Sequence, residues 1–160
     1  SVIAGIADLV GENGLGVIEF HYTQVILKEL QYDSIYHEHL LYFSLKTISG
    51  LLDLYGLNIF DVDKSPISGG SLVIYFAKNK RPKTPALLEL EEREINLGLN
   101  DLDTWLGFAR SCRKHAIDFI SMLKDANAMG SVIGYGASAR GSTLLEFLRS
   151  QLKGSGVHHR

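Results

Sequence analysis

The segment from Tyr36 to His39 reads Tyr-His-Glu-His, so several groups that can handle protons follow one another in the chain. A histidine with its ordinary pKa of about 6.5 can take up a proton at neutral pH, and a carboxylate such as Glu38 can orient the ring or hold its charged form. The phenols of Tyr32, Tyr36 and Tyr42 can donate hydrogen bonds to a substrate oxygen on which negative charge develops. The segment is therefore a candidate for general acid–base chemistry. A surface loop whose histidines have only structural partners is the alternative.

The same histidines and Glu38 are also of the residue types that bind metal ions. Zinc would need a third ligand, and His37 and His39 lack the i, i+4 spacing of a helical zinc protease. The single cysteine, Cys112, excludes an all-cysteine zinc site and a disulfide within the chain. We therefore predict no metal site, and a metal-dependent hydrolase built on this segment is the weakest alternative.

A second candidate site is the glycine-rich segment that follows a short hydrophobic run near the C-terminus. Gly134 and Gly136 lead from an expected strand into an expected helix, an order that can aim backbone N–H groups at an anion while Arg140 pairs with a phosphate. The segment departs from the dinucleotide fingerprint because its third glycine, Gly141, comes too late, and it lacks the Lys-Ser/Thr ending of a nucleoside triphosphate loop. It predicts phosphate or nucleotide binding, with a tight structural turn as the alternative.

A third segment, Gly69-Gly70-Ser71, precedes another expected strand. Paired glycines allow the backbone to approach a ligand closely, or they form a hairpin turn. The hairpin is the simpler interpretation.

Hydrophobic periodicity and capping signals predict the elements that must position these segments. Ser44 is expected to cap a helix that ends before Gly56. Helices are expected over 1–10, 45–55, 86–97, about 101–126 and 142–152, and strands over 16–20, 57–62, 72–77 and 131–135. Strand 17–20 is expected to be parallel and central in its sheet, and Trp105 to lie in the core on the apolar stripe of the long helix. Strands that alternate with helices indicate an α/β architecture.

Length and composition limit the possible classes of protein. The chain has 160 residues, 46% of them hydrophobic, which fits one domain or one domain and part of a second. A net charge of -2 lacks the basic footprint of a nucleic-acid-binding protein. No apolar run approaches the length of about 20 residues that spans a bilayer, and the first ten residues lack the basic leader of a signal peptide. We therefore expect a cytoplasmic protein without nucleic-acid or membrane partners. Since the chain opens inside a helix without a start signal, we also expect it to be a piece of something larger.

Three strings of the chain, taken in order, resemble the sugar C-methyltransferases. The strings are Asp33–Leu45, which contains Tyr-His-Glu-His-Leu-Leu-Tyr-Phe-Ser, then Gly69–Leu72 and Gly134–Leu145. In that family S-adenosylmethionine (SAM) methylates a carbon beside the ketone of a nucleotide-linked deoxy-keto-sugar. The resemblance therefore implies SAM as the cofactor and a nucleotide sugar as the small-molecule partner, and it leaves the oligomeric state open.

The resemblance also implies an organisation for the chain. The expected fold is α/β: the end of a Rossmann-like methyltransferase sheet, a helical bridge and the start of a second α/β domain that helps to hold the substrate. The corresponding segments are 1–79, 80–128 and 129–160. The strands over 57–62 and 72–77 would be the antiparallel pair that closes the sheet. Because the family's zinc cysteines and its acidic-glycine SAM loop are not among these 160 residues, the chain alone is expected to be inactive.

Roles for individual residues follow from the same resemblance. His39 would be the general base that removes the proton beside the ketone, and Glu38 and Tyr36 would position it or stabilise the enolate. Substrate-binding roles are implied for Gly69, Gly70, Ser71, Gly134, Gly136 and Arg140. The alternative function is a non-catalytic α/β module that binds a nucleotide or a phosphate.

The chain departs from the family pattern beside these motifs. Ser68 and Val73 stand where the family usually has His and Arg, and Arg140 and Ser142 stand where Lys and Asn are common. An Arg in place of a Lys keeps the charge but changes the geometry of its hydrogen bonds. The departures around Gly70 leave open a different substrate.

Overall fold

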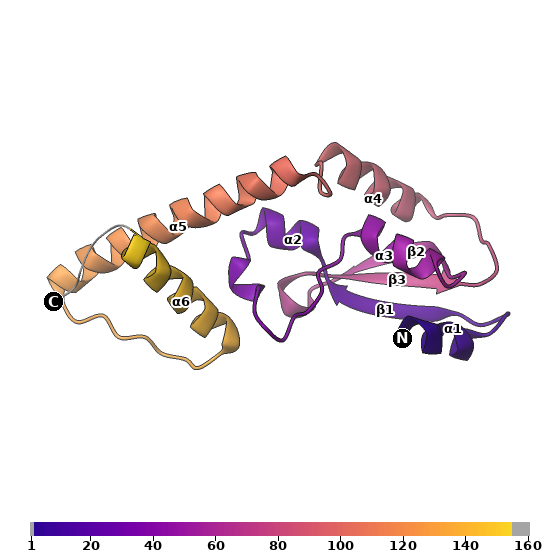
Figure 1. Ribbon diagram of the computed structural model, residues 1–160, viewed down its shortest axis with the longest axis horizontal. Helices are drawn as coiled ribbons and strands as arrows, with labels where there is room; N and C mark the ends of the chain where they lie inside the picture. Colours follow the sequence, from indigo (N-terminus) through magenta and orange to yellow (C-terminus); the bar gives the residue numbers. More distant parts are fainter. Residues whose placement is uncertain (1, 155–160) are drawn as a thin grey trace. The chain divides into compact units, whose positions relative to one another are not determined.

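The computed structural model describes residues 2–154 (Figure 1). These residues form two compact units. The first contains the described residues up to Val25 together with Leu41–Thr104, and the second contains Ile26–Leu40 and the described residues from Trp105 onward. The predicted domain boundaries after residues 79 and 128 stay a prediction.

The first unit is built on a three-stranded antiparallel sheet with the strand order β1-β3-β2. Its strands are β1 (Gly16–His21), β2 (Asn58–Ser65) and β3 (Ser71–Ala77). Its helices are α1 (Val2–Val10), α3 (Leu45–Asp53), the short 3-10 helix η2 (Ile67–Gly69) and α4 (Pro85–Asn96). The central strand β3 carries the most buried side chains, because Leu72, Ile74 and Phe76 are each fully enclosed. The α/β class expected from the sequence is confirmed.

The antiparallel pair expected from residues 57–62 and 72–77 is confirmed by the pairing of β2 with β3. The prediction of a parallel, central strand over 17–20 is wrong. β1 runs antiparallel to β3 and lies at an edge of the sheet that the described residues form. Val17 on β1 is 58% exposed, so this strand is covered on one face only, whereas a central parallel strand is buried on both.

Helix α3 begins where the sequence signal places it. The Oγ of Ser44 accepts a hydrogen bond from the N–H of Thr47, whose own side chain accepts from the Ser44 N–H, so α3 starts with a reciprocal capping box. Gly56 follows the helix with φ of +70°, as predicted. At the start of α4 the Oγ1 of Thr84 accepts the N–H of Leu87 at 3.3 Å, and Pro85 is the first helical residue.

The second unit contains the 3-10 helix η1 (Tyr32–Ser34) and two longer helices, α5 (Leu102–Met129) and α6 (Ala139–Gly154), of which α5 begins in the first unit. The short helix α2 (Thr23–Lys28) also spans the boundary between the units. The buried line of α5 is Phe108, Cys112 and Ala116, which recur every four residues. Trp105 is half-buried with its ring edge-on to Phe108, so its prediction as a core residue is wrong. Trp105 comes three residues before Phe108, not four, so it lies at the margin of this buried line.

The strand expected over 131–135 is also wrong. Residues 131–138 have no regular structure and are exposed, and α6 begins at Ala139 rather than at residue 142. A hydrophobic run becomes a strand only where a neighbour pairs with its backbone, and no strand of the described residues lies beside this one. The Oγ of Ser138 instead accepts the N–H of Gly141 at 3.0 Å at the start of α6. No helix among residues 2–154 has the length and apolar character needed to cross a membrane.

Candidate active site

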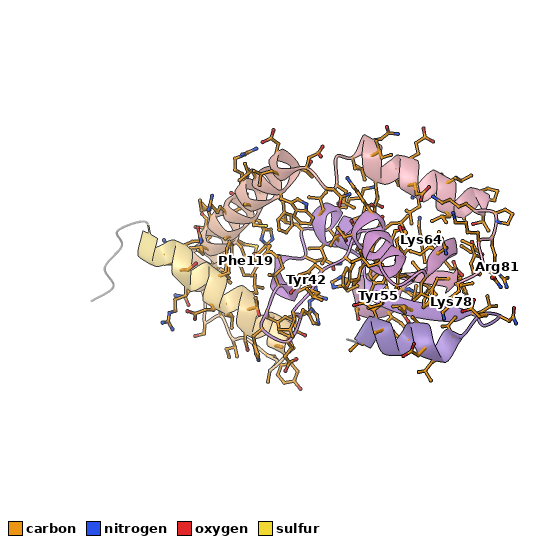
Figure 2. All side chains as sticks on the ribbon, turned by 45° about the vertical axis from the view of Figure 1, so that its right-hand side comes forward. Tyr42, Tyr55, Lys64, Lys78, Arg81 and Phe119 are labelled. Atoms are coloured by element: carbon orange, nitrogen blue, oxygen red, sulfur yellow. The ribbon has the colours of Figure 1, made fainter. Side chains whose placement is uncertain are left out.

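The Tyr36–His39 loop follows η1 in the second unit. The ring of Tyr32 anchors η1, because its centroid lies 4.8 Å from that of Phe147 on α6. Its hydroxyl lies 3.0 Å from Nδ1 of His115 on α5, and that imidazole stacks beside Phe119, which Figure 2 labels. Burial raises the pKa of the Tyr32 phenol above its ordinary value. The loop thus begins from a residue fixed against both long helices.

His39 is oriented by a backbone carbonyl. Its Nδ1 lies 3.0 Å from the carbonyl oxygen of Ser34, and Ser34 is 1% exposed. A carbonyl oxygen can only accept, so Nδ1 is the ring nitrogen that carries the proton. In the neutral imidazole Nε2 therefore holds the lone pair, and it is the atom that can take a proton from a substrate.

Tyr36 packs on this imidazole. The two ring centroids are 4.4 Å apart and the planes are tilted by 37°. His37 lies farther from the same phenol, at 6.2 Å between centroids, and is exposed. Glu38 is exposed as well, and the group that binds Nδ1 of His39 is the Ser34 carbonyl. The sequence had predicted a carboxylate or a phenol as the orienting partner. A backbone carbonyl leaves no signal in a pattern of side chains.

Arg140 lies in the first turn of α6 and is paired with a carboxylate. Its Nε and Nη2 donate to Oδ2 and Oδ1 of Asp33 at 2.8 and 3.0 Å. The hydrogen bond to Asp33 raises the pKa of the guanidinium above its ordinary value, so Arg140 stays charged. The guanidinium of Arg140, which was predicted to bind a phosphate, thus already binds the carboxylate of Asp33 on one edge. Its partner Asp33 comes from the same loop region as His39.

The two glycine segments have different surroundings. Gly134 and Gly136 belong to the exposed stretch before α6, where Gly136 has φ of +137°. Gly70 lies in the first unit between η2 and β3 with φ of +133°, and an added Cβ there would lie 2.7 Å from a methyl carbon of Val25. The carbonyl of Gly70 accepts the N–H of Tyr22 at 3.3 Å. The hairpin interpretation of Gly69-Gly70-Ser71 therefore has a local structural reason.

The second unit thus contains Tyr36, Glu38, His39, Gly134, Gly136 and Arg140, and the first contains Gly69, Gly70 and Ser71. Among residues 2–154 no three His, Cys, Asp or Glu side chains gather so that they could hold a metal ion.

Sequence reasoning missed Glu94, a carboxylate that is 3% exposed. Its Oε1 accepts the hydroxyl of Tyr22 at 2.7 Å and the N–H of Leu45 at 2.6 Å, and its Oε2 accepts the N–H of Lys46 at 3.2 Å. A signal was present, because Glu94 follows the buried Leu90 by one helical turn and so stands on the apolar stripe of α4. A charged residue on such a stripe indicates a buried partner.

The hydrogen bonds of Glu94 fasten the chain on both sides of the segment that carries the candidate site. The chain leaves the first unit after Val25 and returns at Leu41. On the return side the carbonyl of Phe43 accepts both the N–H and the hydroxyl of Thr23, at 3.2 and 3.0 Å.

Comparison with known proteins identifies the family. The family described as the C-methyltransferase C-terminal domain matches residues 66–153, more than half of the chain. The chain belongs to the C-methyltransferase family. It is 33% identical over 147 residues to the C-methyltransferase NovU of Streptomyces niveus, a match that covers 90% of this chain and 35% of that protein. The chain thus spans about a third of the length of this relative. The resemblance to C-methyltransferases drawn from the three motifs is confirmed.

Proposed function

We propose that these residues carry the proton-abstracting part of the active site of a SAM-dependent C-methyltransferase that acts on a nucleotide-linked keto-sugar. The observation that carries the proposal is the geometry of His39. The Ser34 carbonyl binds Nδ1 and the Tyr36 ring packs on the imidazole, so Nε2 is the nitrogen that holds the lone pair. The family match and the similarity to NovU support the reaction class.

The chemistry follows from the acidity of a carbon beside a ketone. Nε2 of His39 removes a proton from that carbon, and the electron pair of the broken C–H bond delocalises onto the ketone oxygen as an enolate. The imidazole becomes positively charged and keeps its Nδ1–H on the Ser34 carbonyl. A phenol such as that of Tyr36 stabilises the enolate oxygen by donating a hydrogen bond, and the role proposed for Glu38, which is exposed, is to help to position His39.

SAM, when bound, supplies an electrophilic methyl group. The described residues do not fit it, because the glycine-rich turn before α6 follows no strand and the family's acidic-glycine loop is not in the sequence. The steps assigned to this chain therefore end at the enolate. We expect the 160 residues alone to show no methyl transfer.

The substrate class rests on the resemblance and on the charge of Arg140. A nucleotide-linked sugar carries a diphosphate, and the Nη1 edge of this guanidinium, opposite the edge that holds Asp33, has the geometry to bind an anion. Substrate-binding roles are also proposed for the backbone at Gly134 and Gly136 in the second unit and, separately, for that at Gly69, Gly70 and Ser71 in the first. Calorimetric titration of the chain with thymidine diphosphate, with SAM as a comparison, tests this half of the proposal.

The test of the catalytic role compares two neighbouring histidines in the complete enzyme. His39→Gln should abolish both methyl transfer and the exchange of the substrate's C–H hydrogen with deuterated water. His37→Gln, at an exposed position two residues earlier in the chain, should retain both activities. Wild-type exchange in the His39→Gln enzyme would contradict the proposal, because exchange reports proton abstraction whether or not the methyl group is transferred.

A further inference from the structure

The guanidinium of Arg140 holds the carboxylate of Asp33 through two parallel hydrogen bonds, Nε to Oδ2 at 2.8 Å and Nη2 to Oδ1 at 3.0 Å. Asp33 lies in η1 and Arg140 in the first turn of α6, so the pair joins two elements of the second unit that are far apart in the sequence. Such a fork fixes both the position and the orientation of the carboxylate, which the point charge of a lysine does not.

Stability is not the main consequence of this pair. The side chain of Arg140 is 41% exposed and that of Asp33 is 26% exposed. Water and salt screen a pair of this kind, so it contributes little to the free energy of unfolding. Its larger effect is on the geometry of the backbone to which Asp33 belongs.

Asp33 stands between two fixed residues. Before it, Tyr32 packs against Phe147 of α6, the helix that also carries Arg140. After it comes Ser34, whose carbonyl accepts the Nδ1–H of His39 at 3.0 Å. The direction of this carbonyl depends on how η1 is held, and α6 holds η1 through the ring of Tyr32 and the carboxylate of Asp33.

We propose that Arg140 is a positioning residue for His39: it holds Asp33 so that the adjacent Ser34 carbonyl keeps the imidazole in the orientation that proton abstraction requires. This inference rests on the proposed role of His39 as the base. It goes beyond the anion-binding role predicted from the sequence, which uses the opposite edge of the same guanidinium. The two roles differ in kinetics, because loss of positioning lowers kcat whereas loss of a substrate contact raises KM.

The experiment measures kcat and KM of methyl transfer by the complete enzyme. Asp33→Asn is the informative variant, because it removes the carboxylate and leaves the guanidinium available to a phosphate. We expect it to lower kcat by about tenfold to a hundredfold, since small displacements of a catalytic group have effects of this size, with KM changed less than twofold. Arg140→Gln should lower kcat to the same extent, and the double variant should be no worse than either single one. The exchanged pair, Asp33→Arg with Arg140→Asp, should recover part of the lost kcat.

The matched control is Arg149→Gln, which makes the same substitution on the same helix at a more exposed ion pair with Glu146. It should leave kcat and KM at the wild-type values. The midpoint of thermal unfolding, recorded for every variant, shows whether a lower kcat reflects a smaller folded fraction. If Arg140→Gln does not fold, Asp33→Asn makes the same test without it.

The inference is overturned if Asp33→Asn keeps the wild-type kcat, whether Arg140→Gln then raises KM or changes nothing. His39→Gln in the same assay separates this failure from that of the proposed function. Turnover by the His39→Gln enzyme would contradict the role of His39 as the base. If the His39→Gln enzyme is inactive and the Asp33→Asn enzyme is fully active, only the positioning role of the ion pair is contradicted.

Discussion

The hydroxyl of Tyr22 donates a hydrogen bond of 2.7 Å to Oε1 of Glu94, and both groups are buried. The same carboxylate accepts the N–H groups of Leu45 and Lys46 at the start of α3. Tyr22 precedes the segment 26–40 and Leu45 follows it. A single side chain of α4 therefore holds the chain where it leaves the first unit and where it returns. The anionic carboxylate also lies at the positive end of the α3 dipole, where it is stabilised.

Removal of this carboxylate should be among the most destabilising single substitutions in the first unit. Glu94→Ala leaves the buried hydroxyl of Tyr22 and two N–H groups of α3 without their acceptor, and we expect the free energy of unfolding to fall by about 3 kcal/mol. Glu92→Ala makes the same change at an exposed position of the same helix and should cost less than about 0.5 kcal/mol. Urea unfolding of the chain and its two variants measures both values. Equal stability of the two variants would contradict the conclusion that Glu94 holds the chain on both sides of this segment.

The phenol of Tyr22 should give the chain an alkaline limit. Burial first, and then the hydrogen bond to Glu94, raise the pKa of this phenol far above its ordinary value. The unfolded chain loses the proton above about pH 10 and the folded chain keeps it, so the free energy of unfolding should fall by up to about 1.4 kcal/mol per pH unit above that pH. Below pH 10 this contribution is constant.

Comparison with Tyr22→Phe isolates this effect. The variant should be less stable than the wild type at neutral pH, and the difference should shrink as the pH rises above about 10. Tyr135→Phe, at a fully exposed position, should follow the wild-type curve throughout. Unfolding free energies measured between about pH 8 and pH 11 decide the matter. A constant difference between wild type and Tyr22→Phe would show that the phenol keeps its ordinary pKa in the folded chain.

The sequence predicted most clearly the features that depend on residues close together in the chain. Ser44 and Gly56 limit α3 through groups within one helical turn, and both predictions are confirmed. The buried hydrogen bonds of Glu94 could have been predicted in the same way, from a carboxylate on the apolar stripe of α4. These features depend on short-range spacing, which a sequence shows directly.

Features that depend on distant partners could not be predicted in this way. Strand 17–20 has the hydrophobic pattern of a buried strand, but its direction depends on which strand pairs with it, and β3 pairs antiparallel. Residues 131–135 have a strand-like composition and no pairing strand among the described residues. The partner of His39 is a carbonyl and that of Arg140 is a carboxylate more than one hundred residues away. Such partners become visible only when the fold brings them together.

The glycines at 70 and 50 should respond in opposite ways to alanine. Gly70 has φ of +133° and a methyl group of Val25 at 2.7 Å from the position of a Cβ, so Gly70→Ala should destabilise the chain by about 2 kcal/mol. Gly50 lies inside α3 with open space beside it, so Gly50→Ala should stabilise the chain by about 0.5–1 kcal/mol. Thermal unfolding of the two variants checks both signs. A neutral Gly70→Ala would mean that the backbone here does not need glycine for structure, which would favour a contact with ligand.

The thiol of Cys112 should be protected from modification in the folded chain. It is 3% exposed on the buried line of α5, and burial raises its pKa, so little thiolate is accessible at neutral pH. We expect a disulfide reagent such as dithionitrobenzoate to modify it at the rate at which the chain unfolds and immediately in concentrated urea. The matched control places a cysteine at Ile117, which is 61% exposed, in a Cys112→Ala background. Ile117→Cys should react at once without urea. The reverse order of reactivity would mean that the face of α5 that carries Ile117, and not the face that carries Cys112, is the covered one.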